Sequence, residues 1–221
     1  MKRIVLMGAV ALFGLSNAQI AKGTSYLSGQ VGYYHSENND DAGSRRKDDV
    51  IRILPTIGYF VNSNLAVGLG IGYKNAVTKY KVSGFGSLNT IEIKDTDNAF
   101  VVAPFVRKYW TLSDKLYIFG QLQVPLEFGK EKVDFNSEGD GGDPILSAPF
   151  KQKNNYTNIG VNIKPGLDYF VTKNWSIEAT IGEFGYNTYK RDIDGARRAD
   201  DYKFGISLTS VTFGVKYVFA K

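Results

Sequence analysis

The stretch Leu65-Ala66-Val67-Gly68-Leu69-Gly70-Ile71-Gly72-Tyr73-Lys74 alternates large apolar residues with small or charged ones. A period of two is typical of a β-strand whose faces meet different surroundings, because successive side chains of a strand point to opposite sides. One face of this stretch is Leu, Val, Ile and Tyr, while the other is mostly Gly and ends in Lys. The stretch therefore predicts a strand with one apolar face and one crowded, polar face.

The same alternation returns in residues 158–169 and 118–128. The polar face of a water-soluble sandwich would be rich in Lys, Glu and Thr, whereas here it is rich in Gly, Asn and Gln with single charges of both signs. That composition suits the interior of a narrow barrel, which side chains must fill. We expect the apolar face to contact lipid and the other face to fill the barrel.

Eight strands can be counted, and most exceed the roughly 9 to 11 residues that a tilted membrane strand requires. An even number follows if both chain ends lie on the periplasmic side. The expected fold is an all-β, eight-stranded, antiparallel, up-and-down transmembrane β-barrel. The predicted strands are residues 24–34, 50–61, 65–80, 99–110, 116–132, 156–171, 175–189 and 202–219.

The connections between these strands alternate in length. Three short turns are predicted at residues 62–64, 111–115 and 172–174, and four long polar loops at 36–49, 81–98, 133–155 and 190–201. Short turns on one rim and long loops on the other are typical of outer-membrane barrels. We expect the long loops to face the outside of the cell.

A hairpin repeat supports this interpretation. Residues 54–65 match residues 164–175 without a gap, and a looser copy begins at Ala103-Pro104-Phe105. Each copy places a Pro within a strand, at Pro55, Pro104 and Pro165. Because Pro cannot donate a ladder hydrogen bond, we expect a recurrent β-bulge at these positions.

Residues 1–18 are predicted to be a cleaved signal peptide, and residues 19–221 the barrel domain. Lys2 and Arg3 precede an apolar stretch from Ile4 to Leu15, and Ser16-Asn17-Ala18 offers small residues for cleavage before Gln19. Removing Lys2 and Arg3 lowers the formal charge from +5 to +3. That charge does not favour nucleic acid as a partner, and the absence of Cys excludes disulfides and a lipoprotein anchor.

The signal, the Pro-x-x-x-Tyr-Phe hairpins and the final segment Val211-Thr212-Phe213-Gly214-Val215-Lys216-Tyr217-Val218-Phe219 carry a resemblance. On these features the chain resembles the small Gram-negative outer-membrane β-barrel families, OmpA-like and OmpX-like. The resemblance implies an outer-membrane location and recognition of the last strand by the barrel-assembly machinery. Phe219 departs from the commonest form of that signal because Ala220 and Lys221 follow it. The Asn-rich turns also resemble those of Bacteroidota proteins.

Two sets of residues are predicted to build the molecule. Charges inside a narrow barrel must pair, so we expect a lumen charge network. It consists of Arg52, Lys74, Arg107, Glu127, Lys164, Asp168, Glu178 and Lys216. Aromatic residues near the short turns are expected to form a membrane-interface girdle. It consists of Tyr59, Tyr109, Trp110, Tyr169, Trp175, Tyr217 and Phe219.

Other features offer weaker signals for chemistry. His35, the only histidine, precedes Ser36 at the expected outer rim, and lipid A-modifying barrels use a rim His and Ser. Adjacent residues of a strand point to opposite faces, which argues against a catalytic pair. The acidic, Gly-rich residues 136–143 could hold calcium, but they lack the complete EF-hand spacing.

The function that we expect is structural or surface-interacting, in a monomer with a filled lumen and without enzymatic activity, metal or cofactor. Arg and Lys at the outer rim are candidates for binding lipopolysaccharide phosphates, beside lipid as the general partner. A narrow porin-like channel, a lipid A-modifying enzyme and a soluble lipocalin-like barrel are the alternatives. The sequence does not identify a loop ligand.

Overall fold

The computed structural model of the protein describes residues 20–40, 43–83, 90–138, 150–205 and 211–219. The predicted signal peptide lies outside these residues. No helix in the described ranges is long and apolar enough to cross a membrane. The strands are β1 (Ser25–Asn39), β2 (Ser44–Asn62), β3 (Leu65–Ser83), β4 (Thr90–Thr111), β5 (Leu116–Gln123), β6 (Leu126–Glu138), β7 (Phe150–Phe170), β8 (Trp175–Thr180), β9 (Glu183–Arg191), β10 (Ala199–Gly205) and β11 (Thr212–Val218).

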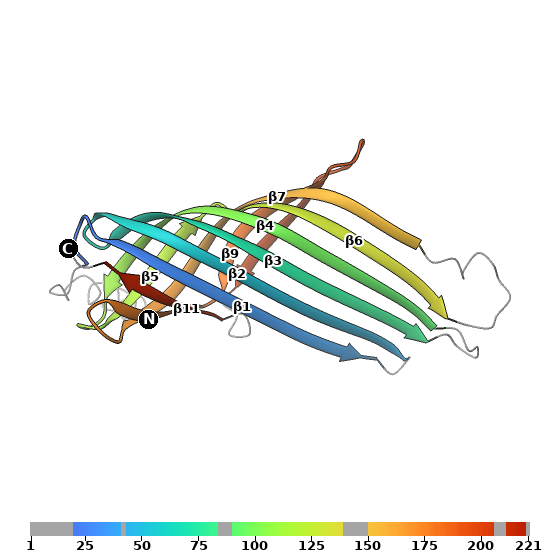
Figure 1. The fold of residues 1–221 in the computed structure, drawn as a ribbon, viewed down its shortest axis with the longest axis horizontal. Coiled ribbons are helices and arrows are strands. Elements are labelled where there is room, and N and C mark those ends of the chain that lie inside the picture. The colour runs from blue at the N-terminus through green and yellow to red at the C-terminus, as the bar shows by residue number, and fades with distance from the viewer. Residues whose placement is uncertain (1–19, 41–42, 84–89, 139–149, 206–210, 220–221) are drawn as a thin grey trace, which may run out of the picture.

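The strands follow one another around an antiparallel ring (Figure 1). β1 to β4 pair in chain order, and β5 and β6 both lie between β4 and β7. The ring closes because β1 also pairs with β11, from Tyr26↔Val218 to Val31↔Phe213. β11 in turn pairs with β8, and β8 with β7. The all-β, antiparallel, up-and-down fold class is therefore confirmed. The short turns lie together at one end of the ring, which we call the turn end; the opposite end is the far end.

The predicted strand count of eight is wrong as a count, because three predicted strands are each divided in two. β5 and β6 are separated by Val124 and Pro125, where Pro supplies no N–H to the ladder. Their register against β4 is nevertheless continuous, since β5 and β6 keep one alignment through Phe105↔Gln123 and Val101↔Glu127. β8 and β9 are separated at residues 181–182, and β10 and β11 by residues 206–210, which lie outside the described residues.

The predicted bulges at the three prolines are also wrong. Pro55, Pro104 and Pro165 pair in regular register, opposite Gly29, Leu69 and Gly120. Their carbonyl groups still accept ladder hydrogen bonds, for example from Val124 N to Pro104 O at 3.0 Å. One register change does occur near Pro165, but the extra residue lies in the neighbouring segment between β8 and β9 and not in β7.

That change is an extra residue between β8 and β9. Gly166 pairs with Thr180, whereas Ile163 pairs with Phe184, so the partner strand gains one residue between them. Gly182 adopts a φ of 80°, a left-handed conformation that glycine accepts without steric cost. As a result, each side chain of β9 lies on the face opposite to the one expected from continuing the alternation of β8.

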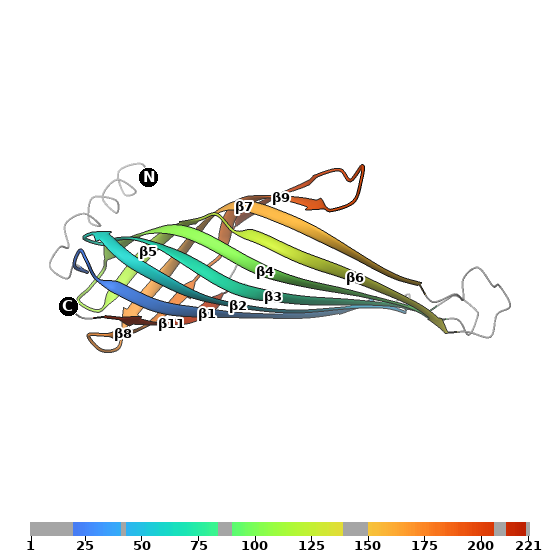
Figure 2. The same cartoon turned by 45° about the horizontal axis from the view of Figure 1, so that its top comes forward.

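The long polar loops of the prediction are largely strands. β1 continues to Asn39 and β2 begins at Ser44, and β3 to β4 and β6 to β7 extend in the same way. Their ladders remain paired along the far segments, as in Glu37↔Lys47 and Lys81↔Glu92. Beyond the far end, β1 to β4, β6 and β7 project as one curved sheet (Figure 2). We call this part the projecting sheet.

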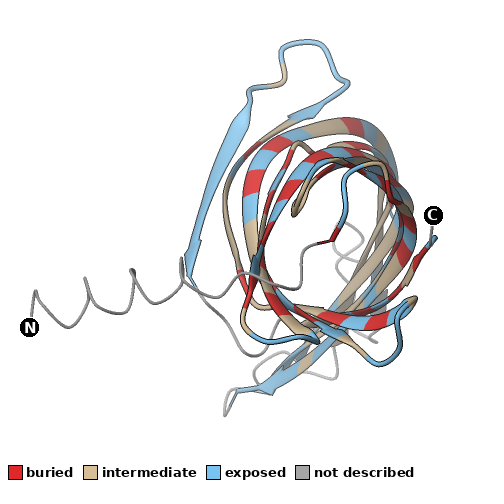
Figure 3. Cartoon of the chain, turned by 90° about the vertical axis from the view of Figure 1, so that its left-hand side faces the viewer, coloured by how far each residue is buried: buried red, intermediate tan, exposed pale blue. Residues whose placement is uncertain are grey.

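Buried and exposed residues alternate along the strands of the ring, as the sequence alternation predicts (Figure 3). Aliphatic side chains such as Ile71, Val161 and Ile163 are exposed on the outside, the last by 53%. Polar and aromatic side chains are buried within the ring, among them Arg107 and Tyr26. Tyr109 also lies inside, at 1% exposure, so its assignment to the membrane-interface girdle is wrong. It precedes Trp110, which is exposed, and neighbouring residues of a strand cannot both face outward.

Candidate functional site

A buried layer of paired charges crosses the interior near the turn end. Arg107 donates from Nη1 to Glu178 Oε2 at 2.6 Å, and Lys216 forms an ion pair with Asp168. All four side chains are at most 1% exposed. Tyr109 OH joins the two pairs, since it receives hydrogen bonds from Arg107 Nη1 at 3.1 Å and Lys216 Nζ at 3.3 Å. We call this group, with the aromatic rings around it, the sealed layer.

Aromatic rings complete the sealed layer. Phe60 packs on Tyr26 and on Tyr109, each with ring centroids 5.6 Å apart, and Phe119 lies 5.8 Å from Tyr109. The Arg107 guanidinium lies 4.2 Å from the centre of the Phe119 ring, which adds a cation–π contact. At the turn end itself, Ile20 is part of the same buried cluster and its N–H donates to Asn64 Oδ1 at 2.9 Å. The interior of the ring is filled here.

Glycines on neighbouring strands make room for these rings. A Cβ on Gly58 would lie 2.2 Å from the Tyr26 ring, and one on Gly166 would lie 2.3 Å from the Phe119 ring. Contacts this short cannot exist between carbon atoms, so the rings occupy the space that the missing side chains leave. The Gly-rich inner face is thus needed for the layer to close.

Toward the far end the interior opens into a polar cavity of about 210 Å³, which we call the vestibule. Glu127 accepts from Lys74 Nζ at 3.4 Å and lies 3.9 Å from Arg52 Nη2. Lys164 Nζ lies 3.3 Å from Glu183 Oε2. The vestibule is polar and only partly enclosed, in contrast to the sealed layer.

The eight residues of the predicted lumen charge network all lie on the inner side, but in two groups. Arg107, Asp168, Glu178 and Lys216 belong to the sealed layer, and Arg52, Lys74, Glu127 and Lys164 line the vestibule. Two partners were missed by the sequence analysis: Glu183, and Asp97, which lies 2.8 Å from Lys74 Nζ. Asp97 fell in a predicted loop. Glu183 follows the extra residue at Gly182, which the alternation could not reveal.

The remaining members of the predicted girdle lie on the outside near the turn end. Tyr59, Tyr169, Trp175 and Phe219 are exposed by 46–50%, Trp110 by 37%. Trp175 packs against Tyr217, with ring centroids 4.9 Å apart. A second belt of exposed aromatics lies farther along the strands, where Tyr73 pairs with Phe100 and Phe100 with Phe128. Exposed aliphatic residues fill the band between these belts.

The outer face of the projecting sheet carries a row of basic residues. Along each strand it continues the exposed apolar face, so that Lys79 lies on the side of Ile71 and Tyr73, about 20 Å beyond Tyr73 along the strand. Lys47 pairs with Lys79, and Lys79 with Lys94. The row continues through Asp134 to Lys151. We call Lys47, Lys79, Lys94 and Lys151 the basic row.

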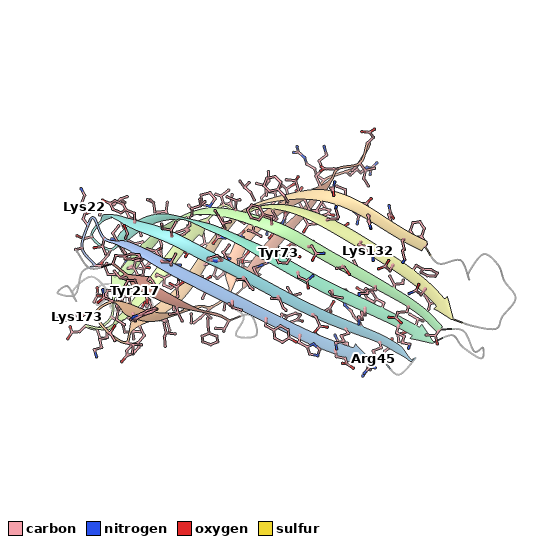
Figure 4. All side chains as sticks on the ribbon, viewed as in Figure 1. Lys22, Arg45, Tyr73, Lys132, Lys173 and Tyr217 are labelled. Atoms are coloured by element: carbon pink, nitrogen blue, oxygen red, sulfur yellow. The ribbon has the colours of Figure 1, made fainter. Side chains whose placement is uncertain are left out.

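Carboxylates lie around the basic row, with Glu37 opposite Lys47 and Asp134 opposite Lys94, but they form few short ion pairs with its lysines. Lys132 donates to Asp134 at 2.7 Å, and this hydrogen bond lowers the pKa of the Asp134 carboxyl group. Within the described part of the chain, Lys79 and Lys94 form no ion pair, and the closest carboxylate oxygen to Lys47 Nζ is 3.9 Å away. Beside the row lies a shallow hollow of about 260 Å³, lined by Glu37, Arg45, Lys47, Lys79, Lys81 and Glu92. Figure 4 locates this region by Arg45 and Lys132, with Lys22 and Lys173 at the turn end.

His35 lies on the outer face of β1, where Nδ1 is 2.7 Å from Asp49 Oδ1. An orienting carboxylate is therefore present, but Ser36 points to the opposite face, and the nearest ring to His35 is Tyr33. No nucleophile is placed beside His35 by the contacts of the described residues. Nor does any group of three or more His, Cys, Asp or Glu side chains within those residues suit a metal ion, and most of residues 136–143 lie outside them.

Comparisons with known proteins give one family match and several similar structures. The chain matches the family model described as "Outer membrane protein beta-barrel domain" over residues 5–219. Similar solved structures include the N-terminal β-barrel domain of Pseudomonas aeruginosa OprF, at 14% identity and a TM-score of 0.34, covering 90% of this chain and 100% of that one. Neisserial surface protein A has 16% identity, a TM-score of 0.39 and coverage of 90% and 98%. Ail of Yersinia pestis has 14% identity and a TM-score of 0.32, and the match covers 90% of this chain and 99% of that one. No curated protein sequence matches the chain.

Proposed function

Because the chain belongs to the outer membrane protein beta-barrel domain family, we propose that it is a non-conducting barrel that binds lipopolysaccharide phosphates on its projecting sheet. The family also gives the location, the outer membrane. The basic row is the observation that carries the proposal. Its role would be to tie the barrel to the lipid headgroups of the outer surface.

The orientation of the barrel supports this role. Outer-membrane barrels have short turns in the periplasm and longer connections outside. The turn end then faces the periplasm, and the projecting sheet rises above the outer leaflet. Tyr73 and Phe100 lie at the level where aromatic residues meet the headgroups, so the basic row stands outside the membrane, about 20 Å farther along the strands.

The arrangement of the basic row favours an anionic ligand. Like charges directly opposite each other on neighbouring strands are destabilising, and Lys47↔Lys79 and Lys79↔Lys94 are two such pairs in succession. Bound phosphates would offset this repulsion and receive charge-assisted hydrogen bonds from the ammonium groups. Lipopolysaccharide supplies phosphates on the outer side of the membrane, the side on which these residues lie.

The sealed layer supports the absence of conduction. Its charges are paired and buried, and buried aromatic rings pack around them. An ion entering from the vestibule would have to separate Arg107 from Glu178 or Lys216 from Asp168. Breaking such a buried pair costs several kcal/mol.

The test compares two triple variants of the full chain in nanodiscs. Lys47→Gln, Lys79→Gln and Lys94→Gln remove three charges from the basic row. Lys22→Gln, Lys108→Gln and Lys173→Gln remove three exposed charges at the turn end. We expect the first variant to bind purified lipopolysaccharide about tenfold or more weakly, and the second to bind like the parent.

Salt provides a second measurement. Binding through exposed charges weakens as ionic strength rises, because the Debye length shortens to about 8 Å at 0.15 M. The parent should lose affinity between low and physiological salt, and the basic-row variant should show little dependence. Equal affinities and equal salt dependence in both triple variants would refute the proposed function.

A further inference from the structure

The hollow beside the basic row is built around two neighbouring pairs of cations. Lys47 lies opposite Lys79, and Arg45 lies opposite Lys81, so four positive side chains stand at the corners of a rectangle on β2 and β3. Arg45, labelled in Figure 4, marks one corner. Like charges directly opposite each other on neighbouring strands repel. The middle of the hollow therefore favours an anion.

A carboxylate stands beside each of two diagonally opposite corners of this rectangle. Glu37 of β1 lies opposite Lys47, and Glu92 of β4 lies opposite Lys81. Glu37 is already occupied, because Arg45 Nε donates to its Oε1 at 2.8 Å. The Glu92 side chain forms no hydrogen bond or ion pair within the described ranges of the chain. The hollow thus has one carboxylate that is free to bind a cation.

The segments that join the neighbouring strands cannot supply a cation to Glu92. One more pair, Ser83↔Thr90, lies beyond Glu92 on the same face before β3 and β4 end. Residues 84–89, which connect these two strands, contain no acidic or basic residue, and residues 139–149 contain no Lys or Arg. The charges of the hollow therefore come from the paired, described parts of β1 to β4.

The lysines of the hollow are available for a ligand. Lys79 and Lys81 form no ion pair among the described residues, and the contact of Lys47 Nζ with Asp49 Oδ2 is long, 3.9 Å. An anion can therefore bind to these three ammonium groups without breaking a short ion pair. The hollow combines an anion-binding centre with one cation-binding position at its side.

The separation of these two positions restricts the ligand. Neighbouring strands lie about 4.8 Å apart, so a cation on Glu92 of β4 would lie about one strand spacing from an anion on Lys79 and Lys81 of β3. A two-carbon linker between a phosphate and an ammonium group covers that distance. A bare phosphate would be repelled by the Glu92 carboxylate, whereas an attached ammonium group would be attracted to it.

We infer that the hollow selects phosphates that carry an ethanolamine substituent, with the phosphate on Lys47, Lys79 and Lys81 and the ammonium group on Glu92. The inference rests on the proposed function, because it names which phosphates of lipopolysaccharide the projecting sheet prefers. Phosphatidylethanolamine has the same headgroup, but the basic row stands about 20 Å beyond Tyr73 along the strand, out of reach of a phospholipid in the membrane. Lipopolysaccharide, whose phosphorylated sugars extend outward from the membrane, is therefore the source.

The first test titrates the full chain in phosphatidylcholine nanodiscs and follows the backbone amide signals by NMR. Two soluble probes are compared: O-phosphoethanolamine and hydroxyethyl phosphate, in which a hydroxyl group replaces the ammonium group. We expect both to shift the amide signals of Lys79, Lys81 and Glu92. O-phosphoethanolamine should bind roughly twofold to fivefold more tightly, the factor expected for one exposed ion pair. Equal affinities, or tighter binding of hydroxyethyl phosphate, would overturn the inference.

Charge variants assign the position of the ammonium group. Glu92→Gln should weaken binding of O-phosphoethanolamine and strengthen binding of hydroxyethyl phosphate, because the same carboxylate attracts ammonium and repels phosphate. Glu37→Gln, which removes the carboxylate already bound by Arg45, should strengthen both probes by a similar factor. Asp114→Asn, an exposed change at the turn end, should affect neither probe. If Glu92→Gln strengthened both probes alike, Glu92 would only repel phosphate and the inference would be wrong.

Lipopolysaccharide binding separates this inference from the proposed function. The parent should bind lipopolysaccharide with ethanolamine on its core phosphates more tightly than the same lipopolysaccharide without it, and Glu92→Gln should lose this preference. The triple variant of Lys47, Lys79 and Lys94 should bind both forms weakly. If the parent bound both forms equally and the triple variant lost both, the proposed function would stand and the selectivity would be wrong. If the triple variant bound both forms like the parent, the proposed function and this inference would fail together.

Discussion

At the scale of single residues, Arg107 and Glu178 depend on each other. Arg107 also donates from Nε to Gln121 Oε1 at 2.7 Å, and Glu178 accepts from Ser28 Oγ at 2.8 Å, so neutral side chains complete the hydrogen bonds of both charged groups. A buried charge that loses its partner keeps its desolvation cost without the attraction. The network is therefore more sensitive to the loss of one charge than to the loss of both.

We predict that Glu178→Leu lowers the free energy of unfolding by about 3 to 5 kcal/mol, because Arg107 is left buried and unpaired. The double variant Arg107→Met with Glu178→Leu should be less destabilised than Glu178→Leu alone. Urea unfolding in lipid vesicles measures both. Arg46→Met, which removes an exposed ion pair with Asp48, is the control and should cost at most about 1 kcal/mol. A Glu178→Leu variant as stable as this control would contradict the pairing.

Gly58→Ala is predicted to destabilise the barrel by about 1 to 3 kcal/mol, because its methyl group would displace the fully buried Tyr26 ring. Gly29→Ala on the neighbouring strand is the matched control, since a Cβ there meets nothing within 4 Å. Urea unfolding midpoints of the two variants in the same vesicles provide the comparison. Equal midpoints would show that the Gly face is not needed to admit the ring.

Single residues also show which parts of the interior could be predicted from the sequence and which could not. The alternation placed the charged residues of the lumen on the inner side because each lies two or four positions from another inner residue. The alternation should also have excluded Tyr109 from the girdle, because its neighbour Trp110 faces outward. Tyr109 and Trp110 were both assigned to the girdle only because they are aromatic. Glu183 could not have been found by counting, because the extra residue near Gly182 has no signature in composition.

At the scale of strands, polar segments were wrongly predicted to be loops. The far segments of β1 to β4 contain Asp, Lys, Arg and Asn, residues that are scarce in strands half-buried in lipid or protein. Backbone ladders do not require apolar side chains, and once the strands have left the membrane both faces can be wet. The position at which the apolar alternation ends therefore indicates where each strand leaves the membrane. It does not indicate where the strand ends.

The membrane band gives a prediction for β3. Leu69→Arg, in the exposed aliphatic band, should cost about 2 to 4 kcal/mol because the charge would be placed in hydrocarbon. Val82→Arg, exposed on the same strand within the projecting sheet, should cost less than about 0.5 kcal/mol. Urea unfolding in vesicles, with a heat-shift gel to count folded protein, measures both. Equal costs would mean that Leu69 does not face lipid.

At the scale of the whole molecule, the sealed layer divides the interior into a filled turn-end half and an open far-end half. We predict that the folded protein in planar bilayers gives no discrete conductance steps, while a general porin inserted from the same detergent does. Steps that recur in independent preparations and scale with salt concentration would identify a continuous wet path and reject a closed bore.

The architecture was more predictable than the site. Alternation, turn lengths and the repeat predicted the meander of strands, and the family match confirms the resemblance to outer-membrane barrels. The sequence did not reveal the basic row, since its lysines become neighbours only through the registers of β2, β3 and β4.

The closing pair of strands has a consequence for how the molecule is made. Tyr26 and Val218 meet at nearly the greatest separation the chain allows, and Phe219 N donates to Ser25 O at 2.9 Å. Contacts so remote along the chain carry a large loop-closure entropy and form slowly. Until the final strand pairs with β1, the other strands form at most an open sheet with two unpaired edges. Unpaired strand edges promote aggregation, so the chain is most prone to aggregate just before the ring closes.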